Sequence, residues 1–248
     1  LLSSLNWKKW SPDPVPLFTP EESLAQFKLA PGFKIELVAH EPMVKDPVFI
    51  EWDDEGRMWV GELRTYMMDL DGSGEDKRMS RVMVLEDTDG DGVMDQATPF
   101  LEDMLNVRSI AFVDEGVLVV ETGGLWFCKD IDGDLRCDER KKLFDFATSA
   151  KDNIEHAENG LHFALDNWMY NSKSSRKLAW RKGKLIEMPA KARGQWGMGS
   201  DAYGRLFFNH NGQWFETDWA MYDRQWPSKG ESVKAPTCLL YTSPSPRD

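Results

Sequence analysis

Apolar and polar residues alternate in short stretches along most of the chain. The stretches "FKIELVA" from Phe33 and "RMWVGEL" from Arg57 have the period of two that is typical of half-buried β-strands. One stretch differs. "TPEESLAQF" begins with Thr19 as a helix N-cap, Pro20 at the first helical position and Glu22 at the third, which is the pattern of a capping box. The pattern therefore predicts an all-β chain with one short N-terminal helix.

A phrase made of an apolar pair, an acidic turn and a short apolar strand recurs four times. The four copies are "FIEWDDEGRMWVGE", "SIAFVDEGVLVVET", "GLHFALDNWMYNS" and "GSDAYGRLFFNHN". Each predicts a β-hairpin whose tight turn places Gly56, Gly116, Asn167 or Gly204 at positive φ. Spacings of 60, 51 and 37 residues suit four-stranded propeller blades. A β-sandwich is the alternative, but its turn signals should recur every 8–12 residues or so. We therefore expect a partial β-propeller, with about four blades of a six-bladed ring.

The expected propeller domain covers residues 19–237. Residues 1–18 contain Pro and Trp without periodicity, so we expect an extended lead-in. The last stretch, "CLLYTSPSPRD" at 238–248, shares no pattern with the rest and resembles translated sequencing-adapter read-through, so we expect a non-native tail on a truncated chain. The net charge of -12 disfavours nucleic acid and anionic membranes as partners. No apolar run approaches the ~18 residues that a membrane span needs.

Two acidic turns stand out from this pattern. "EDTDGDGVMD" holds five carboxylates in ten residues with no Lys or Arg among them. "DIDGDLRCDE", which contains Arg136, repeats the spacing of the aspartates 43 positions later. In the spacing Dx[DN]xDGxxD, alternate side chains of the turn point to one centre, and oxygen ligands without His or Cys favour calcium. The first turn therefore predicts a calcium site with the ligands Asp87, Asp89, Asp91, Asp95 and the carbonyl of Val93.

The second turn predicts a weaker calcium site. Leu135 stands where the first turn has Gly92, and a side chain there strains the bend if φ is positive. For both turns the alternative is a solvated acidic loop without an ion, and the expected role of an ion is structural. The predicted ligands are Asp130, Asp132, Asp134 and Asp138.

Cys128 and Cys137 flank this second turn. Two interpretations stay open: a disulfide that links the two strands, or two free thiols.

Histidine is the first candidate for acid–base chemistry, because GxSxG, HExxH and Walker motifs are absent from the sequence. His156 lies just before the inner strand of the third hairpin phrase, and propeller sites gather on loops that open at the axial channel. Imidazole is the usual base for a hydroxyl proton near neutral pH. A surface histidine is the alternative. His210, after a later strand, is a further candidate, whereas His162 is expected to pack in a strand and His40 to lie at the surface.

Polar residues also stand at the ends of predicted inner strands. Glu62, Arg64, Asn159 and His210 are candidates for holding a cofactor in the channel. For Glu62 and Arg64 the alternative is a surface ion pair, worth about 0–1 kcal/mol.

Several stretches also resemble a known family over about residues 17–215. "TPEESLAQFKLAPGFKIELVAHEPMVKDPVFIEWDDEGRMWVGELRTY", "VLEDTDGDGVMDQATPF" and "NGLHFALDNWMYNS" resemble the N-terminal propeller of the membrane-bound dehydrogenases of planctomycete and verrucomicrobial bacteria. Many of those secreted proteins carry a C-terminal haem-binding CxxCH domain. Their propeller is similar to the soluble glucose and sorbosone dehydrogenases, which bind pyrroloquinoline quinone (PQQ) and calcium.

The resemblance implies a role for His156. In the quinoproteins a catalytic histidine begins the motif HxxGxLxxGPDGxxY, which this chain matches at His156, Leu161, Asp166 and Tyr170 and departs from elsewhere, as at Asn159. His156 would take the hydroxyl proton of the substrate while hydride passes to the quinone.

We therefore expect a periplasmic or secreted quinoprotein-like dehydrogenase that oxidises a sugar or polyol. Its cofactors would be calcium and PQQ, and any c-type haem would lie in a downstream cytochrome domain, because no CxxCH occurs in this sequence. The alternative is a non-catalytic, calcium-braced propeller that binds a glycan or a cell-surface partner.

Overall fold

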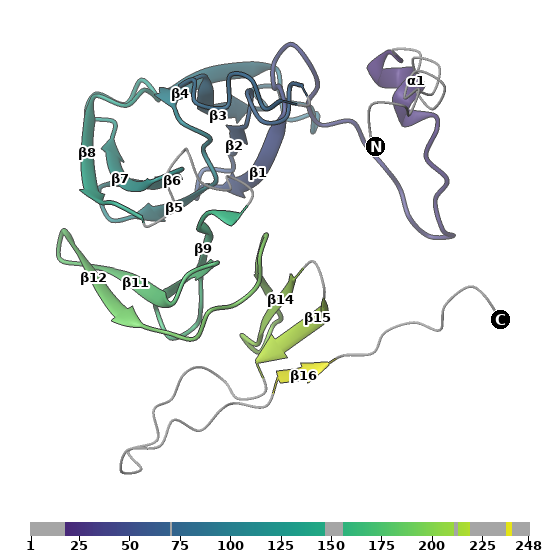
Figure 1. The fold of residues 1–248 in the computed structure, drawn as a ribbon. Coiled ribbons are helices and arrows are strands. Elements are labelled where there is room, and N and C mark those ends of the chain that lie inside the picture. Colours follow the sequence, from purple (N-terminus) through teal and green to yellow (C-terminus); the bar gives the residue numbers. More distant parts are fainter. Residues whose placement is uncertain (1–17, 70, 147–155, 211–212, 219–236, 240–248) are drawn as a thin grey trace, which may run out of the picture.

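The computed structural model describes residues 18–69, 71–146, 156–210, 213–218 and 237–239. Within these residues the chain is almost all β, and it forms four four-stranded antiparallel sheets in chain order, the blades of a propeller (Figure 1). The predicted fold class is confirmed. The strands are β1 (Pro47–Trp52), β2 (Met58–Glu62), β3 (Ser80–Glu86), β4 (Gln96–Met104), β5 (Ser109–Val113), β6 (Gly116–Glu121), β7 (Gly124–Lys129), β8 (Glu139–Phe144), β9 (Asn159–Phe163), β10 (Met169–Ser172), β11 (Arg176–Arg181), β12 (Lys184–Pro189), β13 (Gly199–Ser200), β14 (Leu206–His210), β15 (Gln213–Asp218) and β16 (Thr237–Leu239).

The predicted helix is present as α1 (Pro20–Leu24). The Glu22 N–H donates to the Thr19 hydroxyl at 3.2 Å, and the Thr19 N–H donates to Glu22 Oε2 at 2.8 Å. This capping box satisfies main-chain groups that a single helical turn cannot pair internally. No helix among the described residues is long and apolar enough to cross a membrane.

Apolar clusters join each blade to its neighbour. Trp59 and Val84 of the first blade pack with Val119 and Cys128 of the second. Further clusters join the second blade to the third and the third to the fourth, and β5 contacts β9 near the centre of the arc (Figure 1). The other face of the first blade is covered by residues 38–44, which pack on Met58, Val60, Met83, Leu85 and Met94.

The alternation of strands gives the propeller two edges, which we name by the connections they carry. The linker edge holds the connections between blades and those between the second and third strands of each blade. The hairpin edge holds the turns between first and second strands and between third and fourth strands. Every candidate residue can be assigned to one of these edges from its place in the strand order.

Two expectations about local structure are wrong. Residues 33–39 are not a strand, because their main chain pairs with no neighbouring strand among the described residues, and Val38 instead packs on the first blade and accepts a hydrogen bond from Met94 N–H at 2.8 Å.

In the second hairpin the positive φ belongs to Glu115, at 73°, and not to Gly116. Gly116 is constrained by packing, since a Cβ there would lie 2.4 Å from the Cys128 carbonyl oxygen. The other three turn residues do have positive φ.

The predicted domain boundary at 237/238 falls inside β16, in which Cys238 pairs with Thr217 of β15. The non-native origin of residues 238–248 stays a prediction. Residues 1–17 and 240–248 lie outside the described part of the chain.

Candidate functional site

The strand order separates the predicted metal ligands from the other predicted site residues. The β3–β4 and β7–β8 turns, which contain all the candidate aspartates, lie on the hairpin edge of the first and second blades. Glu62, Arg64, His156, Asn159 and His210 lie at or near strand ends on the linker edge. The two groups therefore belong to two separate sites.

The first acidic loop is shaped by its own main chain around Asp87. The carboxylate of Asp87 accepts the N–H of Gly90 at 2.7 Å and that of Gly92 at 2.9 Å. Both glycines have positive φ, at 78° and 91°, which bends the loop sharply enough to form these bonds. The N–H donors, Gly92 first among them, hold the pKa of Asp87 below its ordinary value. The side-chain oxygens of Asp87, Asp89 and Asp91 lie within 4.8 Å of one another.

Asp95, the fourth predicted carboxylate of this loop, is held in a different way. It accepts the N–H of Thr88 at 2.9 Å and the Thr88 hydroxyl at 2.8 Å. The N–H of Val93 donates to Asp91 Oδ1 at 2.8 Å, which orients that side chain. Three of the four predicted carboxylates therefore converge. Asp95 instead links the end of the loop to its beginning through its bonds with Thr88.

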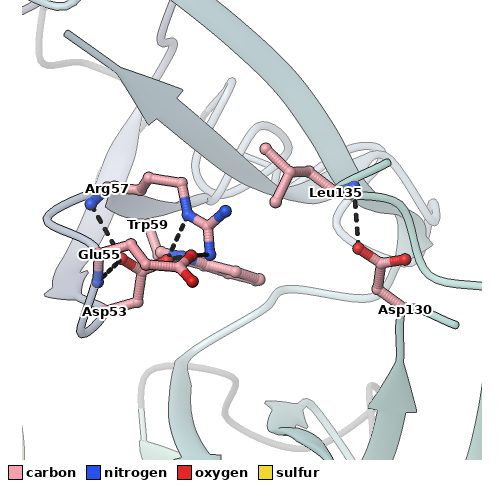
Figure 2. A network of polar contacts seen from close by, with 6 residues as sticks. All are labelled: Asp53, Glu55, Arg57, Trp59, Asp130 and Leu135. Atoms are coloured by element: carbon pink, nitrogen blue, oxygen red, sulfur yellow. Dashed lines mark hydrogen bonds and ion pairs between the residues drawn. The ribbon is translucent and has the colours of Figure 1, made fainter. Parts of the chain in front are cut away.

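The second acidic loop repeats this arrangement at equivalent positions. Asp130 accepts the N–H of Gly133 at 2.8 Å. It also accepts the N–H of Leu135 at 2.9 Å (Figure 2). The side-chain oxygens of Asp130, Asp132 and Asp138 lie within 4.8 Å of one another, whereas Asp134 accepts the Arg136 N–H at 2.9 Å and is outside this group. Leu135 has a φ of 65°, so the position does require the left-handed conformation that the sequence raised as a source of strain.

A third turn on the same edge shows how an aspartate is neutralised without an ion. Asp53 accepts the N–H of Arg57 at 2.9 Å, its Nε at 2.6 Å and Trp59 Nε1 at 2.9 Å (Figure 2). Asp201 and Arg205 repeat the arrangement in the fourth blade. By contrast, none of the ion pairs between described residues involves an aspartate of either acidic loop. Within the described residues, therefore, no basic side chain neutralises the aspartates of the acidic loops in the way that Arg57 and Arg205 neutralise Asp53 and Asp201.

The strain at Leu135 can be measured with two substitutions. We expect Leu135→Gly to be more stable than Leu135→Ala by about 1 kcal/mol, because alanine keeps the cost of the left-handed conformation and glycine removes it. Both lose the packing of Leu135 against the cluster of Trp59 and Cys128. Urea unfolding of the two variants measures the difference. Leu143 of β8 has ordinary φ, so there glycine should be the less stable variant. The same order at both positions would contradict the assignment of strain.

On the linker edge, three segments bring charged and aromatic side chains together around Arg108. Arg108 lies just before β5 and donates from Nε to the Thr122 hydroxyl at 3.2 Å. Its guanidinium carbon lies 5.1 Å from the ring centre of Trp196, in the segment before β13. The side chain is 3% exposed, and burial lowers its pKa to about 10, although Tyr66 and then Glu158 act in the opposite direction. We call Arg108, Thr122, Glu158 and Trp196 the Arg108–Glu158 cluster.

Glu158 lies immediately before β9, the first strand of the third blade. It is 8% exposed, and burial raises the pKa of its carboxyl, although Arg176 and Arg108 act in the opposite direction. Its Oε2 atom has no hydrogen-bond partner among the described residues. A buried carboxylate oxygen without a partner is costly in a folded protein, so such a group is a candidate for contact with a ligand.

His156 lies two residues before Glu158 in the same segment and is half-buried. Asn159 is also next to this cluster, but main-chain groups engage its amide: Nδ2 donates to the carbonyls of Gln195 at 2.7 Å and Ala157 at 3.1 Å, and Oδ1 accepts the Gly197 N–H at 3.2 Å. These bonds fix the segment that carries His156 to the segment that carries Trp196. The cofactor role of Asn159 stays a prediction.

Glu62 and Arg64 form an ion pair at 3.2 Å, with Glu62 only 2% exposed. Glu62 also accepts the Lys45 N–H at 2.8 Å. In the second blade Glu121 stands at the same strand end and accepts the Leu105 N–H at 2.8 Å. In the first and second blades the carboxylate thus holds the segment that leads into the first strand. This repetition indicates a structural role beside the predicted cofactor role of Glu62 and Arg64.

The remaining histidines occupy ordinary positions. His210 ends β14, half-buried, with its ring centre 6.3 Å from that of Phe208. His162 lies within β9, where burial lowers its pKa, and His40 is exposed. Of the motif residues that the resemblance aligned, Tyr170 donates its hydroxyl to Asp166 at 2.8 Å next to the β9–β10 turn, and Leu161 packs between the second and third blades.

An open pocket of about 370 Å³ lies beside this edge on the fourth blade. The residues that line it are Trp196, Gly197, Met198, Gly199, Ser200, Phe207, Phe208 and Asn209. Since Trp196 belongs to both, the pocket and the Arg108–Glu158 cluster adjoin.

Sequence reasoning missed Arg108, Glu158 and Trp196. They could have been recognised because their positions hold different residue types in the other blades. By contrast, the turn aspartates have counterparts in another blade, and so do Glu62 and Glu121. Residues that repeat serve the scaffold that all blades share, so the site is to be sought among residues that do not.

Comparisons with known proteins complete this description. No curated protein sequence matches the chain. Among solved structures it is similar to the PQQ domain of pyranose dehydrogenase from Coprinopsis cinerea (11% identity, 73% of this chain, 46% of that chain, TM-score 0.46), to a gluconolactonase from Xanthomonas campestris (13%, 70%, 57%, 0.45) and to a streptogramin B lyase (11%, 73%, 54%, 0.43). The chain thus spans about half the length of these structures. Residues 19–241 match a family described as a domain of unknown function, DUF7133. The chain belongs to this family.

Proposed function

We propose that the linker edge binds a sugar or another polyol and oxidises one of its hydroxyl groups. The observation that supports the proposal is the Arg108–Glu158 cluster. An indole offers a flat apolar face for a sugar ring, while a guanidinium and a carboxylate offer a planar donor and a planar acceptor for neighbouring hydroxyls. Glu158 Oε2, buried and without a partner among the described residues, is the acceptor in this arrangement.

His156 is the proposed base that takes the hydroxyl proton. It precedes Glu158 by two residues, and Asn159 fixes the segment that carries both side chains. An imidazole that is half-exposed can exchange its proton with solvent after each turnover. In this division of roles Glu158 orients the hydroxyl and His156 deprotonates it.

PQQ, the cofactor that the resemblance implies, carries three carboxylates and requires an excess of cationic side chains. On the described part of the linker edge several guanidinium groups already have a carboxylate partner: Arg64 pairs with Glu62, Arg78 with Glu121 and Arg176 with Glu187. These residues do not fit a tricarboxylate. The proposed oxidation therefore names its electron acceptor only as a two-electron acceptor, and a downstream c-type haem stays part of the expectation.

Dye reduction tests the proposal. The purified protein, given calcium and either PQQ or a soluble quinone, should reduce a redox dye in the presence of aldoses or polyols. His156→Ala should slow this reaction about 100-fold, because general-base catalysis contributes about that much. His40→Ala is the matched control, since His40 is exposed and outside the linker edge. If no acceptor supports dye reduction, or if both variants are equally active, the catalytic proposal is wrong.

A second candidate function, glycan binding without catalysis, is favoured by the pocket of the fourth blade. None of the side chains that line it is ionisable, and they combine aromatic rings with the amide of Asn209. Retention of the protein on a glycan column, weakened by Trp196→Ala and without turnover of the glycan, would support this function over the first.

We further propose that each acidic loop binds a calcium ion that stabilises its blade. In each loop three converging carboxylates that form no ion pair with a described residue support this assignment, because hard oxygen donors suit calcium. The ligands proposed for the first loop are Asp87, Asp89, Asp91, Asp95 and the Val93 carbonyl, and for the second Asp130, Asp132, Asp134 and Asp138. A periplasmic or secreted location, where calcium is plentiful, belongs to the same proposal.

A further inference from the structure

The two cysteines at the ends of the second acidic loop pack in the same apolar cluster. Cys128 is the penultimate residue of β7 and is fully buried, and Cys137 is half-buried, one residue before Asp138. Both pack in the apolar cluster between the first and second blades. The Cys137 thiol donates to the Glu139 carbonyl at 3.1 Å. The structure has both as free thiols. Cys238, the third cysteine, lies in β16 of the fourth blade, in a different sheet.

Comparison of the two acidic loops shows what these positions do. The main chain closes in the same way in both: Asp95 N–H donates to the Glu86 carbonyl at 2.9 Å, and Asp138 N–H donates to the Lys129 carbonyl at 2.9 Å. In this register Leu85 and Met94 of the first loop occupy the positions of Cys128 and Cys137. Leu85 and Met94 are buried in one apolar cluster. In each loop, therefore, the residue two positions before the first aspartate and the residue just before the last aspartate pack in the same apolar cluster.

The second loop needs this closure more than the first. It has Leu135, with its left-handed conformation, at the bend where the first loop has Gly92. Two cysteines also fill less volume than a leucine and a methionine, so packing alone holds the ends of the second loop less firmly. A covalent bond between the same two positions would compensate for both differences.

We propose that Cys128 and Cys137 form a disulfide, made by exchange with a small-molecule or protein disulfide, and that this bond clamps the second acidic loop at its ends. Cys137, the more accessible thiol, attacks one sulfur of the donor disulfide and releases one thiol. Cys128 then attacks the Cys137 sulfur of the mixed disulfide and releases the second thiol. The two protein thiols lose two protons and two electrons, and the donor disulfide is reduced to two thiols.

The experiment compares the oxidised and the reduced protein. The chain with Cys238→Ser, which leaves only the two thiols in question, is incubated with oxidised glutathione or with dithiothreitol. Thiol titration in denaturant should find no free thiol after oxidation and two after reduction, and the intact mass should fall by two hydrogens. The melting temperature of the oxidised form should be higher by about 5–10 °C, as expected for a short closed loop in a chain of this size.

The matched control is Cys128→Leu/Cys137→Met, which copies the apolar pair of the first loop and should fold. Its melting temperature should be the same in both buffers. Two free thiols after treatment with oxidised glutathione, or a glutathione adduct that stays on Cys137, would overturn the proposal. A melting temperature that does not differ between the two forms would overturn the clamp. Because disulfides persist in oxidising compartments, a stable bond would also favour the proposed periplasmic or secreted location.

Discussion

Glu121→Ala is expected to lower the free energy of unfolding by about 3–5 kcal/mol, because it leaves buried donors without their acceptor. The Glu121 carboxylate is 4% exposed and accepts three hydrogen bonds of 2.8 Å, from Leu105 N–H, Arg78 Nη2 and Trp126 Nε1. Arg140 adds an ion-pair contact at 3.8 Å. These partners come from both the first and the second blade, so the substitution loosens the junction between them. Urea unfolding measures the loss.

Two control variants separate the effect of the charge of Glu121 from the effect of its buried position. Glu121→Gln keeps one carbonyl acceptor and the side-chain volume, so it should lose less than the alanine variant. Glu102→Ala removes a carboxylate that is 49% exposed in its side chain and pairs with Arg81 at 3.2 Å, and it should cost less than about 1 kcal/mol. Equal losses for Glu102→Ala and Glu121→Ala would contradict the proposed junction.

Calcium is expected to raise the free energy of unfolding by about 2.7 kcal/mol for each acidic loop when its concentration is about 100 times the dissociation constant. The reason is that the converging carboxylates repel one another in the folded state and not in the unfolded chain, until an ion lies between them. Thermal unfolding with calcium and then with a chelator measures the difference.

Two controls test this prediction: a different divalent ion, and an aspartate outside the acidic loops. Magnesium at the same concentration should stabilise less, because it requires a tighter octahedral arrangement of ligands. Asp91→Asn should weaken the calcium response, whereas Asp54→Asn, exposed on the neighbouring turn, should not. An equal response to both ions, or no response to calcium, would refute ion binding by these loops.

Acidification should act in the same direction as chelation. The folded-state pKa of Asp87 lies below its ordinary value, so its contribution to stability is present above the unfolded pKa and is lost as the pH falls through the folded one. Calcium should therefore dissociate as the carboxylates of the loop become protonated.

The sequence predicted those features whose causes are local. The blade repeat was visible because each hairpin needs its own turn chemistry, and the acidic loops were visible because the ligand spacing lies within nine residues. Leu135 could be identified as a strained position for the same reason, since the comparison with Gly92 requires only the alignment of two loops.

Features that depend on the packing of blades could not be predicted from the sequence. Arg108 and Glu158 are 50 positions apart and come together only because the second and third blades lie side by side. Residues 33–39 alternate between apolar and polar side chains, and this pattern predicted a strand. The same pattern arises in a segment that does not pair with a strand but packs one side on a blade. The correspondence between Glu62 and Glu121 can likewise be recognised only once the strand ends are aligned.

The arrangement of the two edges has a practical consequence. Strands of five or six residues separate the acidic loops from the Arg108–Glu158 cluster by roughly 15–20 Å. An antibody directed at the loops would bind the hairpin edge, while the linker edge, the proposed sugar site, stayed exposed to solution. Immobilisation in this orientation should therefore leave uptake from solution unhindered.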